Sequence, residues 1–151
     1  MNDVERFLAH AIALERDAAR RYEELAAAMQ TDGRAELKAF FARMAHFSRL
    51  HLAEAQARGQ WRELPVLAPH EYEWPDGIAP ETADWVGVDA QMTVRHALEL
   101  ALESERRGHA YYASIAALTH DPELRHLAGE FAAEEAEHLA ELERRLHACA
   151  A

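Results

Sequence analysis

The positions of the prolines constrain the fold of this chain more than any other feature of its sequence. All five lie outside long stretches rich in alanine and leucine, at positions 65, 69, 75, 80 and 122. Because proline is the strongest helix breaker, the stretches that lack it are predicted to be helical. We predict helices over residues 3–30, 33–58, 90–119 and 122–148. The breaks between them fall at Thr31-Asp32-Gly33, at Gly59, and at Asp121-Pro122-Glu123, where Asp121 suits an N-cap and Pro122 a first helical position.

A proline- and tryptophan-bearing segment, residues 60–89, separates the two predicted helix pairs. It is long enough to cross the length of a bundle, and we expect Trp61, Trp74 and Trp85 to pin it to the helices. Two antiparallel helix pairs joined by one long crossover is the connectivity of ferritin-like bundles. We therefore predict an all-α, antiparallel four-helix bundle, with residues 1–151 forming one domain. No stretch alternates apolar and polar residues long enough to predict a strand.

The charge and cysteine content exclude several classes of function. The net charge of -11, from 27 acidic and 16 basic residues, disfavours binding to nucleic acid or to anionic membranes. The single cysteine, Cys149, excludes a disulfide framework and a Cys-x-x-Cys metal site within one chain. We find no secretory signal and no apolar run of about 18 residues, so we expect a cytoplasmic protein without a membrane span.

Each predicted helix carries polar residues in an otherwise apolar stripe of three- and four-residue steps. These inward polar residues are Glu15, His51, Glu105, Glu135 and His138. A shift of 90 residues superimposes Glu15 on Glu105, and a shift of 87 superimposes His51 on His138. The chain thus reads as a duplicated helix pair, and such a duplication would bring these positions to one depth around a pseudo-twofold axis.

Three carboxylates on these stripes converge with two histidines and no basic residue. An unpaired buried carboxylate costs several kcal/mol, so a positive charge must compensate. Oxygen and imidazole ligands suit iron, manganese or zinc. The alternative interpretation is that each residue is a satisfied core polar group or lies on the surface. We favour one metal site that contains all five residues.

The sequence resembles the rubrerythrin branch of the ferritin-like superfamily, in its short form without a rubredoxin domain. The resemblance covers nearly the whole chain, and its most specific part is the run from Ala132 to His138, which contains Glu135-x-x-His138. The resemblance implies a bundle in which two helices each supply one glutamate and two each supply Glu-x-x-His, together holding two irons. It also implies reduction of hydrogen peroxide or dioxygen, or oxidation of ferrous iron.

The sequence departs from that family pattern at Ser48, where a glutamate should precede His51 by three residues. Because that glutamate bridges the two metals in the family, we expect a site weakened to one metal, bound first on the His138 side. Ser48 could still hydrogen-bond a metal-bound water. His109, one turn beyond Glu105, is a possible replacement ligand. Tyr22 and Tyr112 either donate hydrogen bonds to the ligands or are ordinary core residues. We expect the glutamates that lie off the stripe, at positions 134, 137, 141 and 143, to be solvated.

Three functions stay open at this point. The leading hypothesis is a non-haem iron oxidoreductase of peroxidase or ferroxidase type, with iron in one or two ions and an external electron donor. The second is a metal-binding, storage or scaffold bundle without oxidase turnover. The third is a metal-free interaction module whose faces pair as a dimer. For the leading hypothesis we also expect a homodimer.

Overall fold

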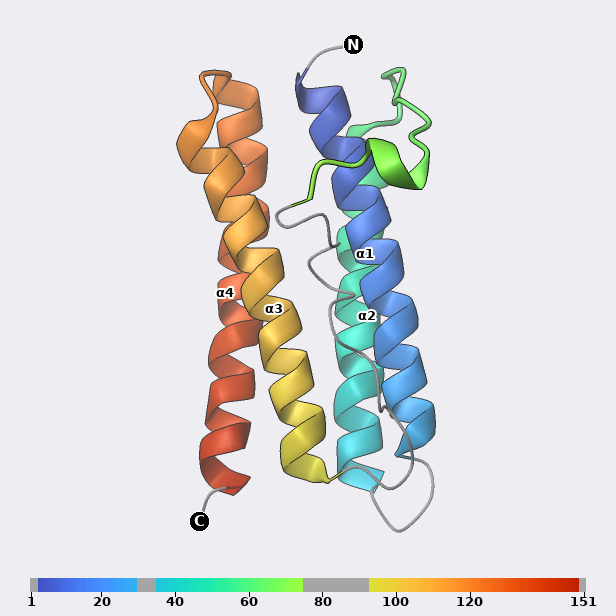
Figure 1. Cartoon of the computed structure of the whole chain (residues 1–151), viewed down its shortest axis with the longest axis vertical. Helices are drawn as coiled ribbons and strands as arrows, with labels where there is room; N and C mark the ends of the chain where they lie inside the picture. Colours follow the sequence, from blue (N-terminus) through green and yellow to red (C-terminus); the bar gives the residue numbers. More distant parts are fainter. Residues whose placement is uncertain (1–2, 30–34, 75–92, 150–151) are drawn as a thin grey trace.

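Four helices account for most of the chain. The computed structural model describes residues 3–29, 35–74 and 93–149. In chain order the elements are α1 (Asp3–Ala28), α2 (Ala35–Arg58), the short 3-10 helix η1 (Pro69–Glu71), α3 (Val94–Leu118) and α4 (Pro122–Cys149). The described ranges contain no strand, and the predicted all-α four-helix bundle is confirmed (Figure 1).

The helix ends follow the signals in the sequence. Oδ1 of Asp121 accepts hydrogen bonds from the backbone N–H groups of Glu123 and Leu124, at 2.9 and 3.4 Å, so Asp121 caps α4 as predicted. Gly59 directly follows α2. Helix α3 starts at Val94, later than predicted, because Oγ1 of Thr93 accepts from the N–H of His96 over 3.0 Å and caps it there. The turn predicted at residues 31–33 lies outside the described residues.

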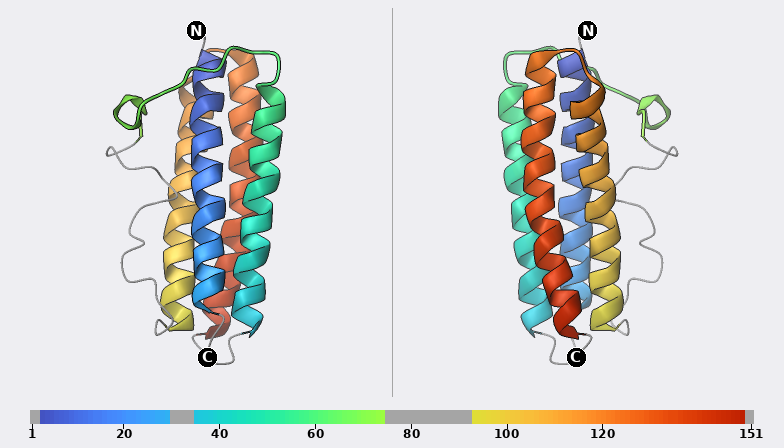
Figure 2. Two further views of the ribbon diagram at one scale, coloured as in Figure 1. Left: turned by 90° about the vertical axis from the view of Figure 1, so that its right-hand side faces the viewer. Right: turned by 90° about the vertical axis from the view of Figure 1, so that its left-hand side faces the viewer.

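The helices form two antiparallel pairs, α1 with α2 and α3 with α4, which face each other (Figures 1 and 2). Helix α2 ends beside the start of α1, whereas α3 begins at the opposite end of the bundle (Figure 1). The chain between them therefore joins opposite ends of the bundle. This is the long crossover that the sequence predicted, although residues 75–92 lie outside the described part.

Trp74 and Trp61 of the crossover differ in how far they are buried against the helices. Trp74 packs on the bundle, with its ring 4.9 Å from that of His10 and 5.2 Å from that of Tyr111, so it pins the segment as predicted. The same prediction is wrong for Trp61, which is 90% exposed. Trp61 lies three residues after the end of α2, and an ion pair between its neighbour Arg62 and Glu123 of α4 holds the chain there instead. Trp85 lies outside the described residues.

The core consists of two apolar clusters, one toward each end of the bundle. One includes Leu25, Phe41 and Leu98, and the other includes Leu8 and Phe131. Val94, the first residue of α3, is 38% exposed, so the apolar face of this helix is buried only from its next turn onward. The inward glutamates lie in sequence between the members of the two clusters, so apolar layers flank them along the bundle axis.

Candidate metal centre

All four helices contribute to a polar layer in the middle of the bundle. Glu15 comes from α1, His51 from α2, Glu105 from α3, and Glu135 and His138 from α4. The three glutamates are each 1% exposed, His51 is 8% exposed, and His138 is half-buried. The helical periodicity that predicted an inward direction for these residues is therefore matched by their burial.

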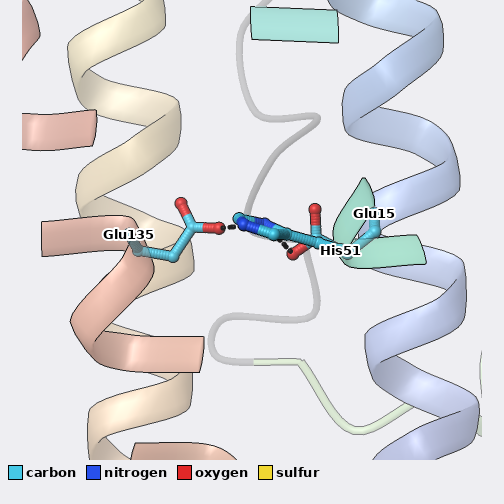
Figure 3. A group of neighbouring side chains, drawn as sticks. All are labelled: Glu15, His51 and Glu135. Atoms are coloured by element: carbon cyan, nitrogen blue, oxygen red, sulfur yellow. Dashed lines mark ion pairs between the residues drawn. The ribbon is translucent and has the colours of Figure 1, made fainter. Parts of the chain in front are cut away.

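The first group of potential ligands consists of Glu15, His51 and Glu135. Nδ1 of His51 lies 3.5 Å from Oε1 of Glu15 and 3.7 Å from Oε1 of Glu135 (Figure 3). One ligand atom from each residue lies within 4.8 Å of the others. The imidazole thus stands between two carboxylates that come from opposite helix pairs.

The second group consists of Glu105, Glu135 and His138. Nδ1 of His138 lies 3.6 Å from Oε2 of Glu105 and 4.0 Å from Oε2 of Glu135. The rings of His51 and His138 stack with their centroids 5.3 Å apart. Glu135 belongs to both groups and faces one histidine with each of its oxygens. The five residues therefore form two adjoining positions with a shared carboxylate.

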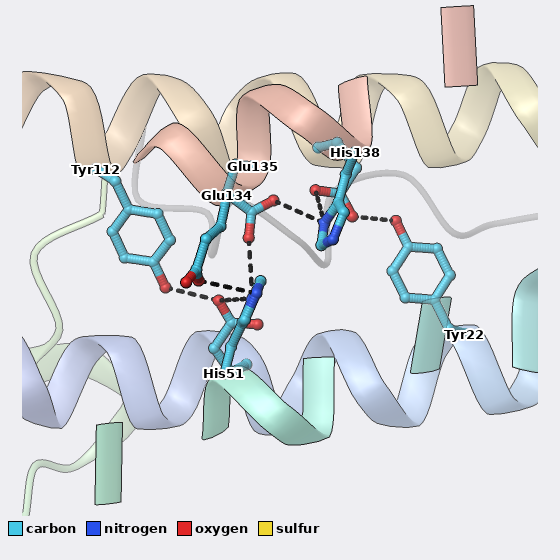
Figure 4. Close-up of polar contacts among 8 residues, drawn as sticks. Tyr22, His51, Tyr112, Glu134, Glu135 and His138 are labelled. Atoms are coloured by element: carbon cyan, nitrogen blue, oxygen red, sulfur yellow. Dashed lines mark hydrogen bonds and ion pairs between the residues drawn. The ribbon is translucent and has the colours of Figure 1, made fainter. Parts of the chain in front are cut away.

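Two tyrosines hold the outer glutamates in a crossed arrangement. The hydroxyl of Tyr22 on α1 donates to Oε1 of Glu105 on α3 over 2.7 Å, and the hydroxyl of Tyr112 on α3 donates to Oε1 of Glu15 on α1 over 2.9 Å (Figure 4). Both tyrosines are fully buried. Each hydrogen bond fixes one carboxylate oxygen and leaves the second oxygen for another partner.

The carboxylates determine the charge state of His51. Burial by itself would lower the pKa of this imidazole, but Glu15, through its hydrogen bond and its charge, together with the charges of Glu134 and Glu105, raises the pKa above its usual value. A cation at the centre of the group is therefore favoured by the surrounding charges.

The ionised form of Glu105 is favoured for a related reason. Burial would raise the pKa of its carboxyl group, but its interactions with Glu135 and His138, the charge of His138 and the hydroxyl of Tyr22, which donates to it, lower the pKa instead. Glu105 is thus a carboxylate at neutral pH, as a metal ligand must be.

The donor set suits a metal ion. Oε2 of Glu15 and Oε2 of Glu105 are buried and have no hydrogen-bond partner within the described part of the chain. Buried polar atoms of this kind are rare in native proteins and are often explained by an ion or a water molecule. Carboxylate oxygens and imidazole nitrogens are the ligands that iron, manganese and zinc accept. The residues therefore fit a metal at either position.

The remaining predicted site residues lie outside these two groups. Ser48 is buried one turn before His51 and belongs to neither group. His109 is half-buried on α3 and also belongs to neither. The expectation of a single metal rests on Ser48 and stays a prediction. Among the described residues the structure presents two ligand groups, which are joined by Glu135.

Two buried polar contacts involve residues that the helical pattern does not predict. Glu134 was expected to be solvated, but its Oε2 is buried and lies 2.9 Å from Nε2 of His51. Burial raises the pKa of Glu134, and His51 acts in the opposite direction. His10 is 3% exposed, and its Nε2 accepts a hydrogen bond from the backbone N–H of Glu73 in the crossover. Neither contact has a signal in the sequence, because each joins segments more than 60 residues apart.

A cavity opens over the polar layer between α2 and α4. Its volume is about 310 Å³, and it is lined by Phe47, Leu50, His51, Glu54, Glu134, Glu137, His138 and Glu141. Both histidines of the centre therefore border a solvent-accessible opening with an acidic lining. Such a lining attracts cations.

Comparison with solved structures supports the four-helix bundle fold. An uncharacterised conserved protein from Magnetospirillum magnetotacticum MS-1 is 42% identical to this chain, over 97% of this chain and 95% of that chain, with a TM-score of 0.79. The chain belongs to the same family as this uncharacterised conserved protein. In this chain the polar layer lies at the centre of the four-helix bundle.

A second solved structure places the fold more broadly. The bacterioferritin-related protein from Bacteroides fragilis, described as a dodecameric thioferritin, is 24% identical over 97% of this chain and 86% of that chain, with a TM-score of 0.69. At this identity the likeness shows a ferritin-like fold. No protein-family model and no curated protein matches the sequence. None of the helices in the described ranges has the length and apolar character needed to cross a membrane.

Proposed function

We propose that this protein is a non-haem iron protein of rubrerythrin type that reduces peroxide or dioxygen, or oxidises ferrous iron, at its carboxylate-histidine centre. The observation that supports this proposal most directly is the sharing of Glu135 between two ligand groups. A carboxylate that faces two histidines, one with each oxygen, suits a bridge between two metal ions. The ferritin-like fold and the sequence resemblance point to the same class.

The protein's own residues divide the work at this centre. Glu15 with His51, and Glu105 with His138, would each hold one ion, and Glu135 would contact both. When bound, iron supplies one-electron redox chemistry and Lewis acidity. Tyr22 and Tyr112 orient the outer carboxylates through their hydrogen bonds. The apolar clusters close the site at both ends along the bundle axis, so the acidic cavity between α2 and α4 is its route to solvent.

Electrons for the centre would come from outside the bundle. Cys149 is the single cysteine among the 151 residues, so these residues cannot hold a thiolate-bound iron that relays electrons. We therefore propose an external electron donor. We also propose a homodimer or a larger self-assembly. The dodecameric state of the bacterioferritin-related protein supports self-association as a property compatible with this fold.

A storage or scaffold function without turnover is the second candidate. The observation that favours it is Ser48, since the carboxylate expected there would add a negative charge to the site. Three buried glutamates balance three positive charges, whereas two ferrous ions carry four. A bundle that binds metal without fast redox chemistry is consistent with this balance.

Two measurements test the proposal. Elemental analysis of protein purified without added metal gives the identity and number of bound ions, and we expect iron. Stopped-flow mixing of the anaerobic ferrous protein with hydrogen peroxide should then show oxidation of the iron faster than that of ferrous iron free in the same buffer. Iron that is bound but oxidised no faster would favour storage, and absence of metal binding would overturn both candidates.

A further inference from the structure

The second nitrogen of His51 has a carboxylate partner of its own. Nδ1 faces Glu15 and Glu135, whereas Nε2 lies 2.9 Å from Oε2 of Glu134 (Figure 4). The Glu134 side chain is 37% exposed, but the oxygen that meets His51 is buried, and its contact with Nε2 is an ion pair without the geometry of a hydrogen bond. The imidazole of His51 therefore lies between Glu15 and Glu135 on its Nδ1 side and Glu134 on its Nε2 side.

The duplication of the chain places a different residue beside His138. The shift of 87 residues that superimposes His51 on His138 also superimposes Phe47 on Glu134. Accordingly, the ring of Phe47 packs on the ring of His138, with centroids 5.3 Å apart. The two histidines thus occupy equivalent places in the bundle, but one is flanked by a carboxylate and the other by an aromatic hydrocarbon.

We propose that Glu134 positions His51 for metal binding and makes the group of Glu15, His51 and Glu135 the first of the two to fill. This inference rests on the proposed function only in requiring that the centre binds a metal. It reverses the order expected from the sequence, in which the His138 side binds first. Glu134 is a positioning residue in this scheme, because it acts through the imidazole of His51.

The physical reason is the fixed tautomer. A neutral imidazole carries one N–H, and a metal can bind only the nitrogen without it. A metal that binds Nδ1, the nitrogen that faces the two carboxylates of the centre, displaces the proton there, and the negative charge of Glu134 beside Nε2 favours keeping the remaining proton on Nε2. A carboxylate on the far nitrogen of a ligating histidine also raises the basicity of the ligand. Phe47 offers His138 neither effect.

Glu134 also adds charge to one position only. Together with Glu15 and Glu135 it places three carboxylates around His51, while His138 has Glu105 and Glu135. A first divalent cation should therefore be drawn to the His51 position. The competing explanation is that Glu134 merely adds to the acidic lining of the cavity, as Glu137 does on the same helix.

Four variants of the full-length protein separate these explanations, with zinc as a diamagnetic probe. Glu134→Phe copies the environment of His138, and Glu134→Gln keeps an acceptor oxygen but removes the charge. Phe47→Glu gives His138 the missing carboxylate. Glu137→Gln is the matched control, since it removes the same charge from the same cavity at an exposed residue.

The readouts are zinc affinity by competition with a chelator and the imidazole ¹⁵N spectrum during a zinc titration, assigned with His51→Gln and His138→Gln. In the parent we expect the His51 signals to shift before those of His138, with Nδ1 bound and Nε2 protonated. Glu134→Phe should weaken the first zinc by about ten- to a hundredfold and abolish this order. Glu134→Gln should lose less affinity, Phe47→Glu should tighten binding at His138, and Glu137→Gln should change little.

The inference is overturned if Glu134→Phe and Glu137→Gln weaken zinc equally, if the His138 signals shift first in the parent, or if zinc binds Nε2 of His51. These results leave the proposed function intact, because zinc is still bound at the centre. A parent protein that binds no metal, by contrast, refutes the proposed function and this inference together. The two failures are therefore distinguishable in the same titration.

Discussion

Tyr112 of α3 donates a hydrogen bond over 2.9 Å to Glu15 of α1, a residue in the other half of the duplicated chain. The reciprocal bond runs from Tyr22 of α1 to Glu105 of α3 over 2.7 Å. Each half therefore supplies the donor that orients the other half's carboxylate. This crossing ties the two helix pairs together at the depth of the proposed metal centre.

The first prediction concerns this crossing. Tyr112→Phe removes the hydroxyl donor from a buried carboxylate, which should lower the free energy of unfolding of the metal-free protein by about 1–3 kcal/mol. With metal bound, the loss should be smaller, because the cation also compensates Glu15. Urea unfolding with a chelator and with excess metal measures both values. Tyr111→Phe is the control, because Tyr111 is a buried neighbour on the same helix, and equal losses in the two variants would contradict the prediction.

The second prediction concerns the shared carboxylate. Glu135 belongs to both ligand groups, so Glu135→Ala should lower the affinity of both ions and should cost more than any other single change at the centre. The expected loss exceeds the roughly hundredfold effect typical of residues that only support a ligand. A metal titration followed by elemental analysis measures it. Glu143→Ala, at an exposed position of α4, provides the control, and an equal metal content in parent and Glu135→Ala would refute the bridging role.

The third prediction concerns Ser48, which is 4% exposed and superimposes on Glu135 under the shift of 87 residues. Ser48→Glu adds a buried charge, which should destabilise the metal-free protein by about 3–5 kcal/mol. The same carboxylate should tighten binding of the second ion and speed peroxide-dependent oxidation, since it offsets the repulsion between two cations. Urea unfolding and metal titration measure the two effects.

Ser48→Gln serves as the uncharged control for this variant. If the parent holds one ion and Ser48→Glu holds two, the one-metal hypothesis from the sequence is correct. If the parent already holds two, Ser48 does not limit the number of ions, and the added carboxylate should change affinity alone.

The fourth prediction concerns pH and His10, which lies away from the metal centre. Burial lowers the pKa of His10, despite its hydrogen bond with the carbonyl of Arg6, and its Nε2 must be unprotonated to accept the N–H of Glu73. Because the folded pKa lies below the unfolded value of about 6.5, the unfolded chain binds more protons. The stability that neutral His10 provides is therefore complete above about pH 6.5 and is lost as the pH falls toward the folded pKa.

Metal-free protein unfolded by urea between about pH 7 and pH 5 tests this sign. The parent should lose more stability on acidification than His10→Gln, whereas the exposed His96→Gln should follow the parent. His51 acts in the opposite direction, since its raised pKa contributes stability that is present at low pH and is lost as the pH rises. Because His51 is present in the parent and in both variants, its contribution cancels when their stabilities are compared. An identical pH dependence in parent and His10→Gln would contradict the prediction.

Helical periodicity in the sequence was sufficient to predict the faces of the four helices. The inward direction of Glu15, Glu105 and Glu135 follows from steps of three and four residues along each helix, and all three are buried. The proline positions and the capping residue Asp121 likewise predicted where helices end, because these signals act on the local backbone. Such features depend on neighbours within a few residues, so the sequence contains them directly.

The contacts between helices were decided by the tertiary structure alone. Periodicity states which way a side chain points from its own helix axis, but the register and approach of two helices determine which atoms meet. For this reason Glu134, which lies off the apolar stripe of α4, was expected in solvent and instead meets Nε2 of His51 on α2. The exposure of Trp61 and the contact of His10 with the crossover have the same origin. The sequence by itself determined which residues line the interior, whereas the packing of the helix pairs decided how Glu135 is shared and which nitrogen of His51 faces the site.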